Sequence, residues 1–264
     1  MIGLKTEIPL DKIERASLYI NTGKKSMAAI KKELGCDHIL NAGLFNMAKF
    51  TPVNWLVADG KILSQGGNPF GYSMWKNSIK FSYANDMGCP DFVGGYPCLI
   101  ANGKQAFDKV PAGLEGDRGR SAIGMTNNSL ILRCMPDVAG AADYTLFELT
   151  QDMFDLGCVN AINLDGGGSS QCDFDGQKIT SSRTVHNYIC VWMKKEGERL
   201  TATTFTNASK RQTVYETTAC LKPIGSLDPY ETATLLYADK TFAVVMYFIT
   251  GKNERKAGFV RLDS

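Results

Sequence analysis

Short apolar runs, each broken by turn-forming residues, follow one another along the first 195 residues. Runs of this kind predict short β-strands. The strands that we expect cover residues 17–20, 38–41, 55–58, 61–63, 97–101, 122–125, 129–133 and 158–162. Asp59-Gly60, Asn102-Gly103 and Asn127-Asn128 each separate two such runs, where they predict hairpin turns. The pattern therefore predicts a mixed, largely antiparallel sheet.

Helices are expected in two places. We expect one over residues 24–34, ended by Gly35. A second is predicted over residues 146–156, because leucine and methionine recur there at helical spacing. Thr145 and Glu148 form a capping-box pattern at its start, so Glu148 is more readily explained as a helix cap than as a catalytic acid. The expected fold class of the first domain is α+β, with helices packed on the sheet.

The composition changes near residue 195, where charged residues and then Thr and Ser replace core-forming residues. We expect a linker there, over residues 196–209. The last segment alternates short strands and turns, a pattern typical of a small β-barrel. The expected domains are a catalytic-type domain over 1–195, the linker over 196–209 and a β-barrel over 210–264.

The run Asn163–Ser170, of sequence NLDGGGSS, carries the clearest chemical signal in the chain. Three consecutive glycines are costly to order, so they indicate a sharp turn or a close approach to a ligand. A tight turn capped by Asp165 and Ser169 is the alternative explanation. Asp175-Gly176 then predicts a hairpin, so the run joins strand to strand. This arrangement excludes the P-loop and the dinucleotide-binding motif, which both open a helix.

Composition narrows the function classes. The chain has 264 residues, 44% of them hydrophobic and 21% charged, as in ordinary globular proteins. The formal net charge of +2 gives no field that would attract nucleic acid or an anionic membrane, so neither is an expected partner. The first residues lack the features of a signal peptide, so we expect a protein that is cytoplasmic as synthesised. Release on lysis would be its route to a cell envelope.

The eight cysteines are scattered, and no C-x-x-C pair occurs among them. We expect small buried hydrophobic residues in a reduced protein and no structural zinc site. Asp165, Asp173 and Asp175 are too sparse for a calcium loop. The sequence therefore gives no indication of a cofactor, and it leaves a divalent cation open.

Five segments together resemble the phosphodiester glycosidases related to the lysosomal uncovering enzyme, which removes N-acetylglucosamine from a GlcNAc-1-phospho-6-mannose diester. They are Asn41–Asn46, Val93–Gly103, Gly119–Gly124, Asn163–Ser170 and Arg183–Asn187, and they occur in the family's order. Within the first segment, an alanine stands where the family usually has glycine. The resemblance implies a hydrolase that acts on a sugar-1-phosphodiester or a related glycan linkage.

The C-terminal segment resembles a bacterial SH3-like domain. Residues 214–215, 224–227, 231–236 and 258–260 fit its usual layout. In bacterial and phage proteins such modules often accompany cell-wall hydrolases. This second resemblance implies a cell-wall polymer as a partner and a bacterial or phage origin.

Cleavage of a sugar-1-phosphodiester requires that the phosphate charge is held and that an oxocarbenium-like transition state is stabilised. Arg120 is the first candidate for holding the phosphate, because a guanidinium matches two phosphate oxygens and stays charged. Arg183 is the second candidate. An ordinary arginine paired with an acid is the alternative for both. Asp165 is the candidate catalytic carboxylate, as nucleophile or as electrostatic stabiliser.

The remaining candidates are polar or glycine positions of the same segments. The expected substrate-binding residues are Asn41, Asn46, Asn163, Gly166, Gly167, Gly168, Ser169, Ser170, Arg183, His186 and Asn187. The three glycine amides and the two serine hydroxyls would form an anion cradle. Asp117 and Asp143 are the candidates for a second carboxylate, although Asp117 would equally serve to orient Arg120. His38 is interpreted as structural.

Two other functions remain open from the sequence. The protein would be a non-catalytic carbohydrate-binding, wall-binding or phage structural protein if the fold had lost its catalysis. It would be an ordinary glycoside hydrolase if a second carboxyl group protonated the leaving group. A wall amidase or peptidase is disfavoured, because neither a Cys-His pair nor a zinc motif stands out.

Overall fold

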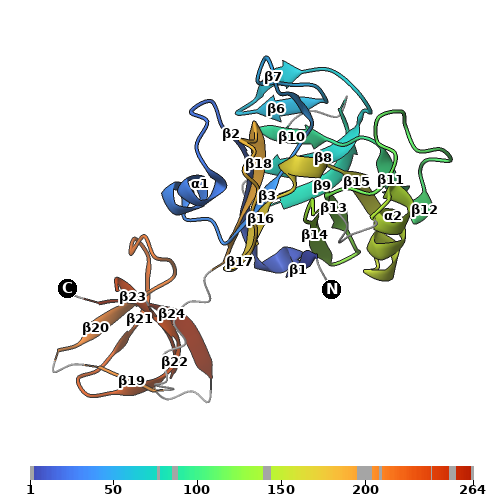
Figure 1. Cartoon of the computed structure of the whole chain (residues 1–264). Coiled ribbons are helices and arrows are strands. Elements are labelled where there is room, and N and C mark those ends of the chain that lie inside the picture. Colours follow the sequence, from blue (N-terminus) through green and yellow to red (C-terminus); the bar gives the residue numbers. More distant parts are fainter. Residues whose placement is uncertain are drawn as a thin grey trace. The chain divides into compact units, whose positions relative to one another are not determined.

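The computed structural model describes residues 3–75, 78–84, 89–138, 144–194, 204–207, 210–238, 240–249 and 254–262. The chain forms two compact units, Met1–Lys194 and Lys195–Ser264 (Figure 1). Most of the expected linker over residues 196–209 lies outside the described residues.

Three antiparallel sheets make up most of the first unit (Figure 1). Sheet 1 has the strand order β1-β14-β13-β15-β11-β12: Leu4–Pro9, Ser129–Met135, Arg120–Met125, Asn160–Asn163, Cys98–Ala101 and Lys104–Gln105. Sheet 2 has the order β17-β16-β3-β18-β2: Gln177–Ile179, Cys172–Phe174, His38–Asn41, Asn187–Met193 and Ile13–Ile20. Sheet 3 has the order β7-β6-β10-β8-β9: Lys61–Ser64, Leu56–Ala58, Asp91–Gly94, Phe70–Trp75 and Ser78–Tyr83. A small ribbon pairs β4 (Phe45–Asn46) with β5 (Thr51–Pro52).

The expected α+β class is wrong, because the structure is mostly β. Strands account for 49% of the structure and helical residues for 11%, with two α-helices in the described part of the chain. The strand pairings described are antiparallel throughout, so the sheets are not mixed. The hairpin turns were predicted at the right places, and Asp59, Asn102 and Asp175 each adopt a positive φ there. The prediction was wrong because it treated two short helices as a helical layer packed on the sheet.

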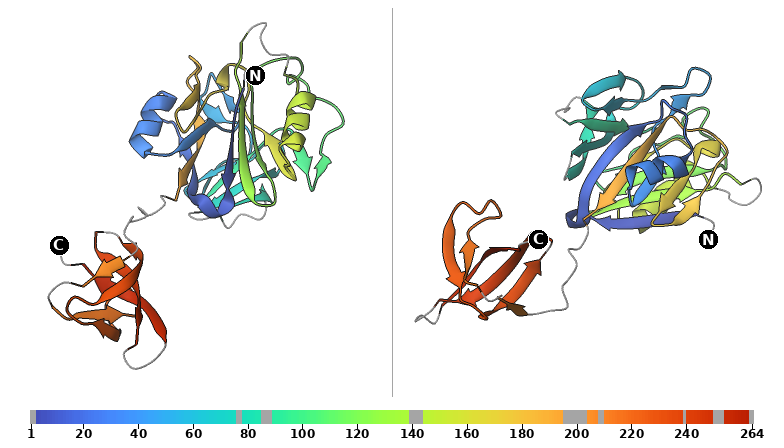
Figure 2. Two further views of the ribbon diagram at one scale, coloured as in Figure 1. Left: turned by 90° about the horizontal axis from the view of Figure 1, so that it is seen from below. Right: turned by 90° about the vertical axis from the view of Figure 1, so that its left-hand side faces the viewer.

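The two helices lie on the outside of the first unit (Figure 2). Helix α1 (Met27–Leu34) is capped by Ser26 and ends at Gly35, whose φ of 62° is left-handed. Helix α2 (Leu146–Asp155) begins with the predicted capping box. Each packs one apolar face on a sheet: Ile30 of α1 beside Ile39 and Tyr188, and Leu149 and Met153 of α2 beside Leu99 and Ala122.

The chain passes from sheet 1 to sheet 2 between β1 and β2, and again between β15 and β16. Strand β15 belongs to sheet 1 and the next strand, β16, belongs to sheet 2. The residues between them, 164–171, include a short 3-10 turn at Gly167–Ser169. Buried side chains from all three sheets meet in the main core, among them Ile162, Leu40 and Tyr72. The NLDGGGSS run therefore lies where two sheets join.

The second unit is a six-stranded antiparallel sheet in the order β19-β22-β23-β24-β20-β21. Its strands are Thr204–Thr206, Thr232–Ala238, Phe242–Phe248, Arg255–Arg261, Gln212–Tyr215 and Pro223–Leu227. The expected closed β-barrel is wrong, because the described strands form no closed barrel and β19 and β21 end the sheet as open edges. The resemblance of this unit to an SH3-like domain stays a prediction. Alternating apolar residues predicted the strands, but such a pattern cannot show whether a sheet closes.

Seven of the eight cysteines are buried, and Cys220 is half-buried. Among the described residues, no helix is both long enough and apolar enough to cross a membrane.

Gly95 allows the segment between β10 and β11 to approach β15 closely. A Cβ at this position would lie 2.5 Å from Cβ of Ile162 and 2.6 Å from the carbonyl oxygen of Asn163. We expect Gly95→Ala to lower the free energy of unfolding by about 2–3 kcal/mol, since backbone must shift to relieve the overlap. Urea denaturation measures this. Gly23→Ala is the matched control, because the nearest heavy atom to its Cβ is 3.5 Å away. Equal stabilities of the two variants would contradict the prediction.

Candidate functional site

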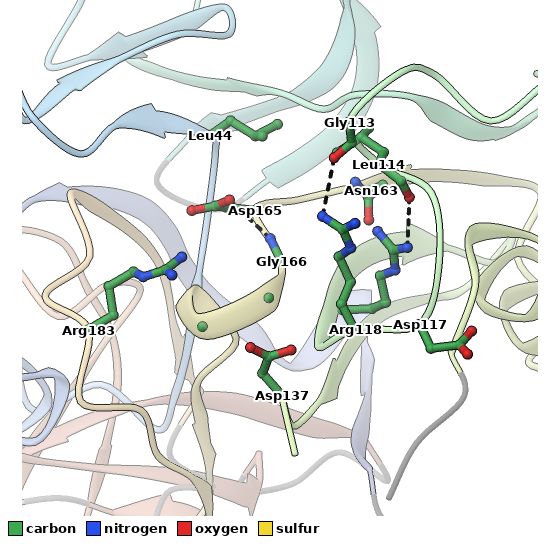
Figure 3. Close-up of a pocket in the computed structure, with 13 residues that line it drawn as sticks. Leu44, Gly113, Leu114, Asp117, Arg118, Asp137, Asn163, Asp165, Gly166 and Arg183 are labelled. Carbon is green, nitrogen blue, oxygen red and sulfur yellow. Dashed lines mark hydrogen bonds between the residues drawn. The ribbon is translucent and has the colours of Figure 1, made fainter. Parts of the chain in front are cut away.

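A pocket of about 450 Å³ opens over the connection between β15 and β16 (Figure 3). Its walls come from that connection, from the loop before β13, from the segment after β14 and from the segment before β18. The lining residues are Leu44, Gly113, Leu114, Asp117, Arg118, Arg120, Asp137, Asn163, Asp165, Gly166, Gly167, Gly168 and Arg183.

Asp165 is held in place by its own backbone. Its N–H donates to the carbonyl oxygen of Ala42 at 2.9 Å. Its carbonyl oxygen accepts a bond from Nδ2 of Asn41 at 2.7 Å. The Asp165 carboxylate accepts from the N–H of Gly166 at 3.0 Å. Ala42 is completely buried, so the alanine that departs from the family pattern is accommodated in the core.

The Asp165 carboxyl group has a raised pKa. Burial raises its pKa from 3.8 to about 6, because the ionised form loses solvation. The Ser169 hydroxyl, the Arg183 charge and the Gly166 N–H each oppose this rise. A carboxyl group with such a pKa exists in both protonation states near neutral pH, which suits acid, base or nucleophilic chemistry.

Close packing against backbone requires glycine at 166 and a left-handed φ favours it at 167, whereas Gly168 faces the flexible end of Arg183. A Cβ on Gly166 would lie 2.7 Å from the carbonyl oxygen of Gly119, and one on Gly168 would lie 2.8 Å from Nη2 of Arg183. Gly167 has a left-handed φ of 57°, and its N–H donates to the Gly119 carbonyl oxygen at 2.7 Å. Two of the three glycine amides therefore bond to the protein. The N–H groups of Gly166 and Gly167 are therefore not free to bind an anion as the predicted cradle requires.

Arg183 lies along one side of the glycine turn (Figure 3). Its Nη1 donates to Oγ of Ser169 at 3.1 Å, and its carbonyl oxygen accepts from Nε2 of Gln171 at 3.1 Å. Ser169 is completely buried beneath it. Ser170 is also buried, and its hydroxyl has no partner among the described residues. Arg183 lines the pocket and Ser169 adjoins Asp165, whereas neither Ser169 nor Ser170 is a lining residue.

Arg120 has a different environment from the one that we expected. Its Nη2 donates to the carbonyl oxygens of Leu114 at 2.9 Å and Gly116 at 2.8 Å, and its Nε donates to that of Tyr144 at 3.1 Å. Its side chain is 1% exposed, and burial, followed by the charge of Arg118, lowers its pKa to about 10. The guanidinium organises the pocket wall. A role as phosphate ligand stays a prediction.

Arg118 and Asp137 were not identified from the sequence. Nη1 of Arg118 donates to the carbonyl oxygen of Gly113 at 3.2 Å (Figure 3). Its Nη2 donates to the carbonyl oxygen of Glu115. Asp137 accepts a bond from the N–H of Gly119 at 2.8 Å, on the other side of the glycine turn from Arg183 (Figure 3). Arg118 could have been found from its position two residues before Arg120. Asp137 could not, because it belongs to no motif and has no characteristic spacing from the other candidates.

Of the two candidates for a second carboxylate, Asp117 lines the pocket. Asp143 lies outside the described residues.

Two of the predicted substrate-binding asparagines hold the backbone. Oδ1 of Asn41 accepts from Oγ of Ser121 at 2.6 Å and from the N–H of Gln171 at 3.1 Å, which links sheet 1 to sheet 2. Oδ1 of Asn187 accepts from the N–H of Gly43 at 2.7 Å. Both side chains are completely buried and neither lines the pocket.

Asn46 and His186 also lie outside the pocket lining. Asn46 is exposed and accepts a turn bond from the N–H of Lys49 at 2.9 Å. His186 packs against the rings of Phe45 and Phe50, and burial lowers its pKa. The described residues contain no group of three or more His, Cys, Asp or Glu side chains that would hold a metal ion.

The family model of the phosphodiester glycosidases matches residues 35–192, a segment that contains all the pocket-lining residues. No curated protein matches the chain with significant similarity.

Several solved structures share the fold. The zebrafish N-acetylglucosamine-1-phosphodiester alpha-N-acetylglucosaminidase catalytic domain, auto-inhibited by its pro-peptide, has a TM-score of 0.57 and 17% identity over 73% of this chain and 84% of that chain. A hypothetical protein from Synechocystis has a TM-score of 0.54 and 16% identity over 73% and 59%. A putative exported protein from Burkholderia pseudomallei has a TM-score of 0.52 and 12% identity over 72% and 73%. On the family match, with this pocket inside it, the chain belongs to the phosphodiester glycosidase family.

Proposed function

We propose that this protein hydrolyses the glycosidic bond of a sugar-1-phosphodiester of the N-acetylglucosamine-1-phosphate type. The observation that carries the proposal is one carboxyl group with a pKa of about 6, Asp165, in a pocket lined by three arginines. Within the described residues, none of the guanidinium groups of Arg118, Arg120 and Arg183 forms an ion pair with a carboxylate. In this described part of the chain, no direct carboxylate contact therefore neutralises the partly exposed guanidinium groups of Arg118 and Arg183, although Asp117, Asp137 and Asp165 line the same pocket.

The chemistry of the leaving group fits this set of residues. A phosphate monoester leaves as a stabilised anion, so it requires charge stabilisation more than protonation. Arg118 and Arg183 are the arginines whose positions suit contact with the phosphate, because both are partly exposed, whereas Arg120 is buried and bonded to three carbonyl groups. Asp165 would attack or electrostatically stabilise the sugar carbon that becomes cationic. An envelope polymer as the natural substrate stays a prediction.

The test compares two substrates with the same sugar: a synthetic GlcNAc-1-phosphodiester and 4-nitrophenyl α-N-acetylglucosaminide. We expect the diester to be hydrolysed with release of free sugar. Arg118→Gln and Arg183→Gln should each raise KM for the diester about 10-fold, since a charge-assisted bond to phosphate is lost. The same changes should leave KM for the uncharged glycoside almost unaltered.

Equal losses on both substrates would contradict phosphate recognition and favour an ordinary glycoside hydrolase. Binding of the diester without any turnover would favour the alternative of a carbohydrate-binding protein.

A further inference from the structure

The side chain of Asn163 is fixed against the segment that precedes β11. Its Nδ2 donates to the carbonyl oxygen of Tyr96 at 2.7 Å. Its backbone N–H donates to the carbonyl oxygen of Pro97 at 3.1 Å, and its own carbonyl oxygen accepts from the N–H of Tyr96 at 3.0 Å. Asn163 is 1% exposed. Three bonds to two adjacent residues leave this asparagine little freedom.

The bond to Tyr96 also determines the orientation of the side-chain amide, that is, which atom is Oδ1 and which is Nδ2. A rotated amide would place two carbonyl-type oxygens 2.7 Å apart, which is repulsive. Oδ1 of Asn163 therefore faces away from Tyr96. This oxygen is buried and has no hydrogen-bond partner among the described residues. A buried acceptor without a partner is rare in native proteins, and Asn163 lines the pocket, where a bound group can supply the missing donor.

The neighbouring groups limit what this oxygen binds. The arginines of the pocket are donors only, so they suit the phosphate of the substrate. Oδ1 of Asn163 is a neutral acceptor, and Asp165 follows it by two residues in the same lining. A neutral acceptor beside the carboxylate suits a hydroxyl group or an acetamido N–H of the sugar.

We propose that Asn163 selects the sugar: its Oδ1 accepts a hydrogen bond from one hydroxyl or acetamido N–H close to the bond that is cleaved. This inference rests on the proposed function and specifies the sugar side of the same pocket. A sugar without that donor would leave Oδ1 buried and unpaired, which a rigid site cannot relieve by rotating the amide.

The experiment measures kcat/KM for a series of sugar-1-phosphodiesters in which one hydroxyl or acetamido group at a time is replaced by hydrogen. Wild type is compared with Asn163→Leu, which has a similar shape and no acceptor. Asn160→Leu is the matched control on the same strand, because Asn160 bonds the N–H of Asn102 at 2.9 Å and does not line the pocket. Circular dichroism verifies folding, and Asn163→Ala replaces the leucine variant if that variant does not fold.

We expect one deoxy analogue to be about 10- to 100-fold poorer than its parent for wild type and for Asn160→Leu. For Asn163→Leu the same comparison should give a ratio below about 3. An unchanged ratio in Asn163→Leu, with the parent diester still hydrolysed, would overturn this inference alone. Failure of wild type to bind or hydrolyse any member of the series would overturn the proposed function and this inference together.

Discussion

Asp165→Asn is expected to lower kcat by about 10²- to 10⁴-fold on the sugar-1-phosphodiester, with little change in KM. Asparagine fits the same space and keeps an acceptor for the N–H of Gly166, so the pocket should keep its shape. What is lost is the negative charge that attacks or stabilises the sugar cation. For wild type, activity should rise as the pH passes about 6, where Asp165 ionises.

The same substitution should make the protein more stable at neutral pH. Burial raises the pKa of Asp165 from 3.8 to about 6, so its protonated form stabilises the fold below the lower value, and this stabilisation is lost as the pH rises through about 6. Asp165→Asn never ionises. We therefore expect the variant to exceed wild type in unfolding free energy by about 2 kcal/mol at pH 8, allowing for partial solvation. Near pH 3.5 the two should be similar.

Urea denaturation at the two pH values, together with initial rates, tests both parts. Asp175→Asn is the control, because Asp175 is exposed in a hairpin turn with a positive φ that asparagine tolerates. A variant at position 165 with wild-type kcat would remove Asp165 from the chemistry. Loss of activity together with loss of stability at pH 8 would show that the residue is structural instead.

Arg120→Met is expected to lower the free energy of unfolding by about 3 kcal/mol. The change leaves the carbonyl oxygens of Leu114, Gly116 and Tyr144 without their donor, and buried unpaired acceptors are costly. The removed charge was itself poorly solvated, which offsets part of the loss. Hydrogen exchange should become faster around residues 113–118, because the guanidinium holds that loop.

The control for this prediction is Arg15→Met. Arg15 is exposed, makes one long bond to Ser17 at 3.4 Å and lies over the ring of Trp192, so its loss should cost under about 1 kcal/mol. If Arg120→Met instead unfolds like wild type and raises KM for the diester, Arg120 holds the phosphate as the sequence predicted.

Local signals in the sequence were reliable. Asp59-Gly60 and Asn102-Gly103 predicted turns that the structure contains, and Thr145 with Glu148 predicted the start of α2. These features depend on a few neighbouring residues. The balance of helix and sheet in the whole chain, and the closure of the C-terminal sheet, depend on contacts between distant segments, and both were predicted wrongly.

The pocket residues also divide into those that a local sequence motif predicts and those that only the folded structure brings together. Asp165 and Arg183 lie in motifs that could be recognised, and the structure brings them into one pocket. Asp137 follows β14 and meets the glycine turn only through the folding of sheet 1, so no sequence spacing marks it. The amide orientation of Asn163 is equally invisible in the sequence, because it depends on the carbonyl group of Tyr96, 67 residues away.

The catalytic candidate belongs to neither sheet alone. The chain leaves sheet 1 at Asn163 and enters sheet 2 at Cys172, and Asn41 joins the two sides through its bonds to Ser121 and the backbone of Asp165. Each sheet could keep its own strand pairing while this joint loosened. Catalytic activity would then be lost before either sheet unfolds. Loss of activity would therefore report separation of the two sheets earlier than a change in secondary structure would.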